Sequence, residues 1–523
     1  MPKSLFDLLH PQLVDSINQR WRIPDWKLHF PWWGPPATCR ILMYTDGSVH
    51  LSGGGFQGLT YVKTLLETHA YYYVNFTVDV CNRDGTDPTA TVNVAHNKLT
   101  DLDILNKYDE IWFFGYNSGA SLDAAEVTLM DQFMAAPKYG GVLTTGDHAA
   151  LGQGLCGQIT RVGQMRQYPA PPSAPPTWNT TLVQRPFAAG EPADPPSAGL
   201  PYNFNDQSDD IPQTIRWKRY WAGVISSRPH PVLCGPNGPI DVLPDHEHEG
   251  EALAPAVAGD ARWPTLAGHQ EEPEVIAWGR IKDPNAAKHG QEIGVISAYN
   301  GQMVDVGRIV ADSTWHHWFD INLIGLAGAS APYTGLIATP DGQAALKKID
   351  AYYLNCGVWL APPAVQDAMR NAAWWSILWQ DAVLELSSDA HVRYFGGVGI
   401  DALGRRAPRC AVFDWVWPKE PIYKPKIPWW EWRELIPELD FTTIPVEQYM
   451  AGGILRELAH AFGHLAGKRS IGDKPPSQEA LRAAIDRGTE KGLAAMRADI
   501  EREHAMVGKL VAQNFEAKGL RKG

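Results

Sequence analysis

Three segments of the sequence bring histidines and carboxylates together, which is the composition that acid–base or metal chemistry requires. The segment "TTGDHAALG" places Asp147 and His148 side by side, and "DSTWHHWFD" contains Asp312, His316 and His317. In either segment an imidazole can move a proton while a nearby carboxylate orients the ring. We therefore predict that these five residues form a catalytic site.

The third segment, "LPDHEHEGEA", has the spacing that suits a metal ion. In an extended segment His246 and His248 point the same way, so they can bind one ion with Glu249 as a third ligand. A divalent metal (Zn, Fe or Mn) is thus a cofactor that the sequence allows, and such an ion can generate a nucleophilic water. The other interpretation of this segment, taken alone, is a solvated acidic loop.

The segments around these residues alternate between apolar strands and amphipathic helices. Mostly apolar runs of strand length are "CRILMYTD" (39–46), "EIWFFGY" (110–116) and "YGGVLTTGD" (139–147). Helical spacing marks "GLTYVKTLLETHA" (58–70) and "LDAAEVTLMDQFMAA" (122–136). This alternation predicts an α/β fold, a flavodoxin-like parallel sheet with helices on both faces.

Ligands of such sheets bind at the carboxyl ends of the strands. Asp46 and the pair Tyr116 and Asn117 come at these ends, and Gly54 and Gly55 lie in the Gly-rich loop "GGGFQG". We predict that these five residues bind substrate, since glycines let a ligand approach the backbone. The loop also matches a dinucleotide-binding pattern, but it begins well past its strand, so nucleotide binding is the weaker interpretation.

The adjacent histidines of "WHHW" belong either to a functional site or to an aromatic core. If the strand "GRIVADSTW" (307–315) runs on through them, alternation sends His316 and His317 to opposite faces. We therefore expect one imidazole at the mouth of the sheet and the other in a structural position.

The rest of the chain indicates several further parts. Residues 1–37 read as an N-terminal helix and a Pro/Trp connector, and 38–330 as the α/β domain with a Pro-rich insertion at about 168–210. A mixed helical and β region follows at 331–440, with a β-pair expected in "HVRYFGGVGIDALGRRAPRCAVFDWVWP", and 441–523 is a helical tail. The chain could form a homo-oligomer through its C-terminal helices.

Composition restricts the classes of partner. The net charge of −12 argues against nucleic acid, and no apolar run approaches the length of about 20 residues that spans a bilayer. The six cysteines lack CxxC pairs, so we expect free thiols and a cytoplasmic location. Cys156 is expected to be a small buried residue. The 21 tryptophans suit loops on which a sugar or another flat small molecule stacks, or packing anchors.

Segments of 39–325 resemble the ThuA-like (trehalose-utilisation) branch of the class I glutamine amidotransferase-like superfamily. The resemblance lies in "RILMYTD", "YGGVLTTGDHAALG", "RPHPVLCGPNGPIDVLPDHEHEGE" and "VGRIVADSTWHHW". It implies that Asp147 and His148 lie where amidotransferases keep a catalytic Cys, and that His316 or His317 is the superfamily's catalytic His. The missing elbow Cys implies that glutamine hydrolysis through a thioester is lost.

Two functions remain in view. The first is an enzyme that acts by His/Asp acid–base or metal-assisted chemistry, with hydrolysis favoured, on a small polar or carbohydrate-like substrate. The second is a catalytically inactive amidotransferase-like protein that binds or assembles with a partner.

Overall fold

The computed structural model describes two compact units. Most of the first is Ala37–Tyr220 with Arg228–Asp367, and most of the second is Ala368–Gly523. The first unit thus continues past the boundary that we expected near residue 330. The residues described are 37–51, 58–69, 73–119, 121–147, 150–167, 185–186, 202–203, 212–222, 226–235, 238–244, 250–282, 289–326, 328, 333–378, 391–404, 407, 409–416, 446–463 and 476–517.

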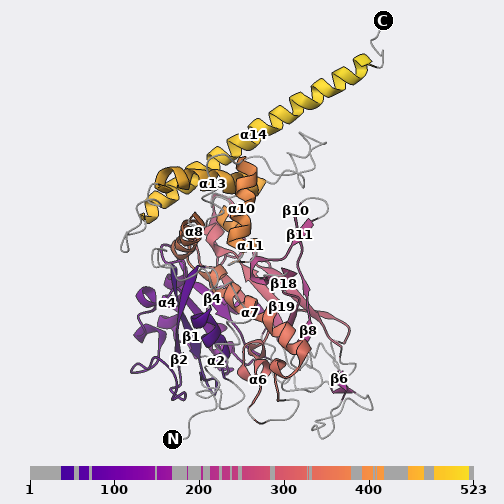
Figure 1. The fold of residues 1–523 in the computed structure, drawn as a ribbon. Helices are drawn as coiled ribbons and strands as arrows, with labels where there is room; N and C mark the ends of the chain where they lie inside the picture. Colours follow the sequence, from indigo (N-terminus) through magenta and orange to yellow (C-terminus); the bar gives the residue numbers. More distant parts are fainter. Residues whose placement is uncertain are drawn as a thin grey trace. The chain divides into compact units, whose positions relative to one another are not determined.

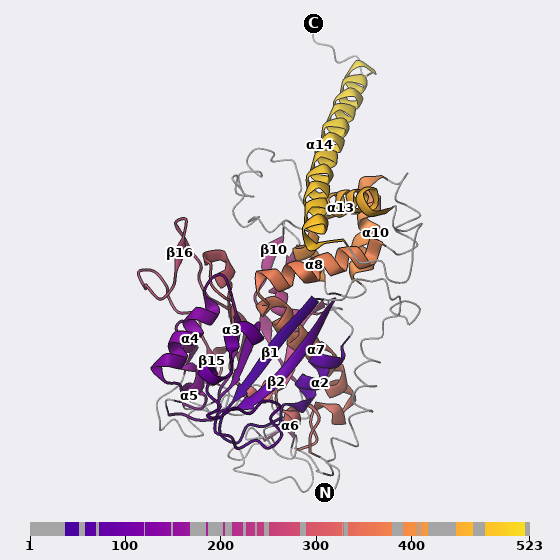
Figure 2. The ribbon, with the colours of Figure 1, turned by 90° about the vertical axis from the view of Figure 1, so that its left-hand side faces the viewer.

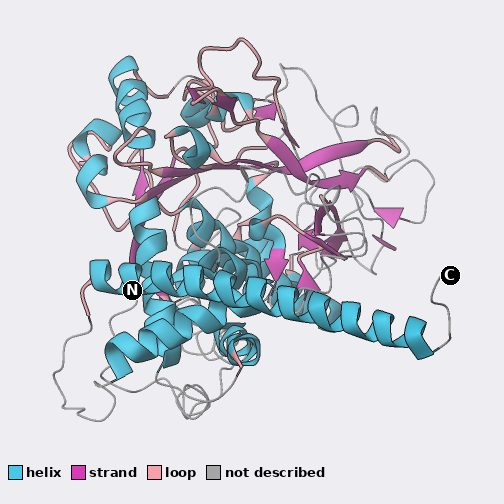
Figure 3. Cartoon of the chain, turned by 90° about the horizontal axis from the view of Figure 1, so that it is seen from above, coloured by secondary structure: helices cyan, strands magenta, loops and turns pink. Residues whose placement is uncertain are grey.

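An eight-stranded sheet forms the centre of the first unit (Figure 1). Its order is β2-β1-β3-β4-β20-β19-β18-β9, and the strands appear as one band from above (Figure 3). The first five in this order are parallel, and β19, β18 and β9 extend the sheet antiparallel. Their bounds are β1 Ala37–Thr45, β2 Val74–Asn82, β3 Glu110–Phe114, β4 Gly141–Thr144, β9 Arg216–Trp217, β18 Glu274–Arg280, β19 Glu292–Tyr299 and β20 Ile309–Asp312. The predicted α/β class with a mostly parallel sheet is confirmed.

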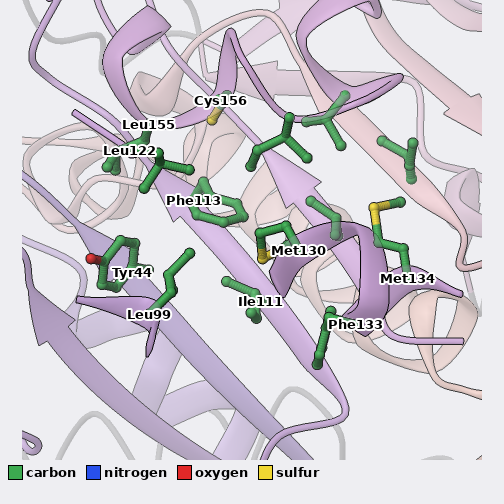
Figure 4. Close-up of a cluster of buried hydrophobic side chains, with 14 of the residues drawn as sticks. Tyr44, Leu99, Ile111, Phe113, Leu122, Met130, Phe133, Met134, Leu155 and Cys156 are labelled. Atoms are coloured by element: carbon green, nitrogen blue, oxygen red, sulfur yellow. The ribbon is translucent and has the colours of Figure 1, made fainter. Parts of the chain in front are cut away.

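The sheet is covered on both faces, as the apolar strands require. Leu42 and Tyr44 of β1 point into a cluster with Met130 and Phe133 of α4 (Ala124–Met134) (Figure 4). The alternate residues of β1 face the other side, where α2 (Thr60–Thr68) and α7 (Pro340–Leu360) contact the sheet (Figure 2). Every residue of β3 is buried, so that strand has no solvent face.

Smaller elements complete the first unit. The short helices are α3 Ile104–Lys107, α5 Gln153–Cys156 and α6 Asp320–Leu323. The 3₁₀ turns are η2 Leu99–Asp101, η3 Val162–Gln164, η4 Pro231–Leu233, η5 Gly301–Val304, η6 Trp315–His317 and η7 Leu336–Ala338. Its two-stranded pairs are β5 Arg166–Gln167 with β15 Glu251–Ala252, β6 Arg185–Pro186 with β7 Tyr202–Asn203, β8 Pro212–Thr214 with β14 Val242–Pro244, β12 Cys234–Gly235 with β13 Gly238–Pro239, and β16 Thr265–Leu266 with β17 His269–Gln270. A further pair, β10 Tyr220–Ala222 with β11 Ser226–Arg228, belongs mostly to the second unit, which includes Trp221–Ser227.

Beyond Ala368, the described residues of the second unit form helices. Its helices are α10 Val392–Gly404, α11 Arg409–Val416, α13 Val446–Phe462 and α14 Gln478–Ala517, and α8 (Pro363–Leu378) continues into it. The β-pair that we expected at 391–418 is therefore wrong, since α10 and α11 occupy most of that segment. The described residues between 333 and 416 contain helices and no strand.

Close helix packing explains this error. A Cβ on Gly396 of α10 would overlap the backbone oxygen of Gln448 in α13, and one on Gly453 of α13 would overlap that of Gly488 in α14. The glycines of "FGGVG" therefore let helix backbones touch. Tertiary contact therefore outweighs the poor helix propensity of glycine here.

Two findings bear on the expected environment of the chain. None of the helices in the described ranges combines the length and apolar character of a membrane span. Cys39, Cys81, Cys156 and Cys356 are free and buried, as expected, but Cys234 is in a disulfide. The expectation of free thiols is therefore wrong at Cys234.

Candidate functional site

The carboxyl ends of four neighbouring parallel strands bring the predicted site residues to one edge of the sheet. In the register of the sheet, Thr45 pairs with Phe114, and Thr144 pairs with both Phe113 and Ala311. The loops that follow β1, β3, β4 and β20 therefore start side by side. Asp46, Tyr116, Asn117 and Asp147 stand in the first three residues of these loops, and Asp312 is the last residue of β20.

Asp147 and His316 come together although 169 residues separate them in the sequence. The Oδ2 atom of Asp147 lies 3.8 Å from Nε2 of His316, and its Oδ1 accepts a hydrogen bond of 3.2 Å from the hydroxyl of Thr314. The two loops are also joined by the backbone, since Trp315 N donates to Gly146 O at 2.8 Å. Asp147 and His316 are each 1% exposed.

The hydrogen bond at Nδ1 of His316 determines which ring nitrogen carries the hydrogen. Nδ1 lies 3.0 Å from the amide oxygen of Asn322, which can only accept, so Nδ1 carries a hydrogen. In the neutral imidazole the lone pair is then on Nε2, the atom that lies 3.8 Å from Oδ2 of Asp147. An imidazole held in this way can take up a proton, and the adjacent carboxylate stabilises the cation that forms.

The turn that carries the histidines is not the strand end that we expected. β20 ends at Asp312, and residues 315–317 form the 3₁₀ turn η6, capped by Thr314, whose hydroxyl accepts from His316 N at 3.1 Å. A 3₁₀ turn has three residues per turn, so consecutive side chains point about 120° apart. His316 and His317 therefore point in different directions for a reason other than strand alternation.

His317 is held on both ring nitrogens. Nδ1 lies 2.6 Å from Oδ1 of Asp312, and Nε2 lies 3.0 Å from the side-chain nitrogen of Gln213. The same nitrogen of Gln213 donates to Pro244 O at 2.7 Å, so it is a donor toward His317. His317 therefore has its hydrogen on Nδ1, and its lone pair is already occupied.

Asp312 is the acceptor at the centre of a buried polar network. Besides His317, it accepts from Trp318 Nε1 at 2.9 Å, from the hydroxyl of Tyr352 at 2.7 Å and from Thr314 N at 3.3 Å. All four donors stabilise the charged carboxylate in a place where water cannot. This number of internal partners is typical of a group that holds structure.

Asp46 keeps one carboxylate oxygen without a partner. Its Oδ1 accepts from Tyr116 N and, at 3.1 Å, from Asn117 N, whereas Oδ2 is buried and unpaired. Burial raises the pKa of this carboxyl. The ring of Tyr116 stacks on that of Trp315 with centroids 6.4 Å apart, and Trp315 Nε1 is likewise buried and unpaired. Asp46 is thus linked through two rings to the turn that carries His316.

Our reading of the sequence missed Arg166, which joins the loops that carry Asp147 and His316. Its Nη2 donates to Asp147 O at 2.8 Å and its Nε to Ser313 O at 3.1 Å, and the side chain is buried. The approach is close, because a Cβ on Gly146 would lie 2.6 Å from Nη1 of Arg166. Thr314 was missed as well, although a threonine just before a turn is a recognisable capping signal.

Asp320 anchors the far end of the same segment by capping a distant helix. α2 lacks a side-chain cap of its own, and Asp320 accepts instead from Thr60 N at 3.1 Å and Tyr61 N at 2.8 Å. Burial raises the pKa of Asp320 to about 6, although these hydrogen bonds oppose the shift. The loop with the histidines is therefore coupled to the start of α2.

The raised pKa of Asp320 predicts a pH dependence of stability. The folded state binds more protons than the unfolded chain between about pH 4 and pH 6, so the stability that this group contributes decreases as the pH rises through that range. We expect Asp320→Asn to remove this term. In urea unfolding, wild type should lose up to about 3 kcal/mol relative to the variant between pH 4 and pH 7. Asp401→Asn, at an exposed carboxylate, is the control and should show the pH dependence of wild type. The assignment would be contradicted if wild type and Asp320→Asn differed in unfolding free energy by the same amount at pH 4 and pH 7.

Several predicted residues lie outside the described part of the chain. These are Gly54, Gly55, His148, His246, His248 and Glu249. Among the residues that the structure does describe, no group of three or more His, Cys, Asp or Glu side chains could hold a metal ion. The metal site therefore stays a prediction.

Comparisons of the chain with protein-family models, curated proteins and solved structures gave no match. The resemblance to the ThuA-like branch of the amidotransferase-like superfamily therefore remains a prediction from the sequence.

Proposed function

We propose that the protein is an enzyme that performs acid–base chemistry at the carboxyl edge of the sheet, with hydrolysis as the reaction. His316 is the general base, and Asp147 stabilises the imidazolium that forms. His317 and Asp312, which we first placed in the catalytic set, are proposed as positioning residues. The observation that carries the proposal is the approach of His316 Nε2 to Asp147 from a loop on the neighbouring strand.

The proposed reaction is attack by a water molecule on the substrate. Nε2 of His316 takes a proton from a water molecule while the water oxygen bonds to the electrophilic centre of the substrate. The bond to the leaving group then breaks, and the leaving group receives the proton from the imidazolium. Because Asp147 and His316 are each only 1% exposed, some of the residues that bury them must move when the substrate binds.

The substrate that we propose is small, polar and carbohydrate-like. Asp46 Oδ2 is an acceptor and Trp315 Nε1 a donor, both buried and unpaired within the described ranges, so each would gain a hydrogen bond from a hydroxylated ligand. Tyr116 and Trp315 add flat ring surfaces at the same edge. An apolar ligand would leave these polar atoms unsatisfied.

The test is a hydrolysis screen with purified full-length protein. We expect turnover of at least one class among p-nitrophenyl glycosides, esters and amides, and a fall in kcat of about 10²-fold or more in Asp147→Asn. Asp401→Asn, an exposed carboxylate on α10, is the control and should leave kcat unchanged. No turnover of any class, or full turnover by Asp147→Asn, would contradict the proposal.

A second candidate is a catalytically inactive protein that binds or assembles with a partner. It is favoured by the deep burial of the candidate catalytic groups and by an exposed apolar stretch on α14. An inert wild type whose mass in solution exceeds that of one chain would support it.

Three finer expectations belong to the same proposal. We propose the flavodoxin-like, ThuA-like form of the α/β fold, supported by the parallel strand order β2-β1-β3-β4-β20 and by the resemblance in the sequence. A divalent metal on His246, His248 and Glu249 would supply an activated water to the same reaction. We also propose a cytoplasmic location. The disulfide of Cys234 argues against it, because disulfides are rare in cytosolic proteins.

A further inference from the structure

The first half of α14 packs against α13 along one stripe of the helix. Gly488 and Gly492 of α14 lie against Gly453 and Tyr449 of α13, so the backbones are in close contact. The contacts run antiparallel, because Arg487 pairs with Glu457 whereas the later Asp499 pairs with Tyr449. The stripe that α14 buries recurs every three to four residues at Leu481, Ala484, Ile485, Gly488, Thr489 and Gly492, and Asp499 is buried two turns later.

The second half of α14 extends beyond these contacts (Figures 1 and 2). Every residue from Glu501 to Gln513 is exposed. Met506, Val507, Leu510 and Val511 are 57%, 55%, 52% and 47% exposed, and they are four of the seven large apolar side chains with high exposure in the described part of the chain. Four such side chains within two turns form a patch of a kind that marks an interaction surface.

The exposed patch continues the stripe that binds α13. Counting in steps of 3.6 residues from Ile485, Gly488 and Gly492, the same face of the helix returns at Asp499 and then at Met506, Val507 and Leu510. This face of α14 is thus apolar in its first and last parts, with Asp499 and Glu503 between them, and within the described ranges only the first part is covered by another helix. The natural occupant of the second part is therefore another helix.

We propose that the occupant is the same segment of a second copy of this chain, so that the protein forms a homodimer through residues 500–513. This segment carries charges of both signs, Glu501 and Glu503 with Arg502 and Lys509. A helix that binds an anionic membrane surface is instead rich in Lys and Arg on its polar face. The inference concerns the second unit only and does not depend on the proposed function.

An antiparallel arrangement suits the sequence of the segment. With the two-fold axis near Gly508, Val507 lies opposite Leu510 of the second copy, and Met506 opposite Val511. A parallel arrangement would instead place Glu503 against the same carboxylate of the second copy, which costs stability. The segment of about 12 residues is only about 18 Å long, so we expect weak association with a micromolar Kd.

The experiment is sedimentation velocity of the full-length chain over a range of concentrations. At about 100 µM we expect wild type to approach twice the chain mass of 57.8 kDa and to dissociate on dilution. The double variant V507E/L510E should weaken self-association at least about tenfold. The matched control A505E/A512E adds the same charge on the opposite face of the same helix and should dimerise as wild type does.

Each alternative outcome overturns the proposal. A wild type that stays monomeric at about 100 µM excludes the dimer, and a V507E/L510E variant that dimerises normally places the interface elsewhere. Wild type that remains monomeric but co-sediments with anionic phosphatidylserine vesicles would show that the patch binds membrane. Circular dichroism of both double variants confirms that α14 is still helical.

Discussion

His316→Gln lowers kcat by about 10²- to 10⁴-fold, the range expected when a general base is removed, while the free energy of unfolding changes by less than about 1 kcal/mol. Glutamine retains a polar side chain that can hydrogen-bond to Asn322, but it cannot take up a proton near neutral pH. The measurement is kcat on whichever substrate class the wild type hydrolyses, together with urea unfolding of both proteins.

The neighbouring histidine provides a matched comparison. His317→Gln should reduce stability more than His316→Gln does, because it disrupts the bonds to Asp312 and Gln213 inside the fold. Its loss of kcat should be smaller when measured under conditions where it is folded. If instead His317→Gln abolishes turnover and His316→Gln does not, the roles that we assign to the two rings are reversed.

Asp312→Ala has the largest expected effect on stability, a loss of about 3–5 kcal/mol in the free energy of unfolding. The carboxylate accepts from His317, Trp318, Tyr352 and Thr314, and its removal leaves these donors buried without an acceptor. Thermal or urea unfolding measures the effect.

A second variant distinguishes the loss of the whole hydrogen-bond network from the loss of a single hydrogen bond. Tyr352→Phe removes one of the donors and keeps the ring, so it should cost about 1 kcal/mol. An Asp312→Ala variant that is no less stable than Tyr352→Phe would show that the carboxylate does not hold the network together.

The α/β class and the edge where the site lies could be predicted from the sequence, because both follow from short-range patterns. Continuous apolar runs such as "EIWFF" in β3 can only be satisfied in a sheet covered on both faces. Polar residues directly after parallel strands must meet at one edge. The sequence therefore predicts that Asp147 and the paired histidines lie at the same edge.

The separate roles of the two histidines could not be predicted, since they depend on partners from distant parts of the chain. Gln213 stands 104 residues before His317, and Tyr352 comes from α7, 40 residues after Asp312. No short sequence pattern predicts these hydrogen bonds. The same holds for α10, where packing of Gly396 against α13 decides the structure of a segment whose glycines alone indicate a turn.

The segment 312–320 is held at both ends, and this limits how it can change. Trp315 N binds the loop after β4 at one end, and Asp320 caps α2 at the other, so an insertion or deletion between them would break both attachments together. Related proteins that acquire new substrates should therefore alter the loops on either side and retain the length of this one.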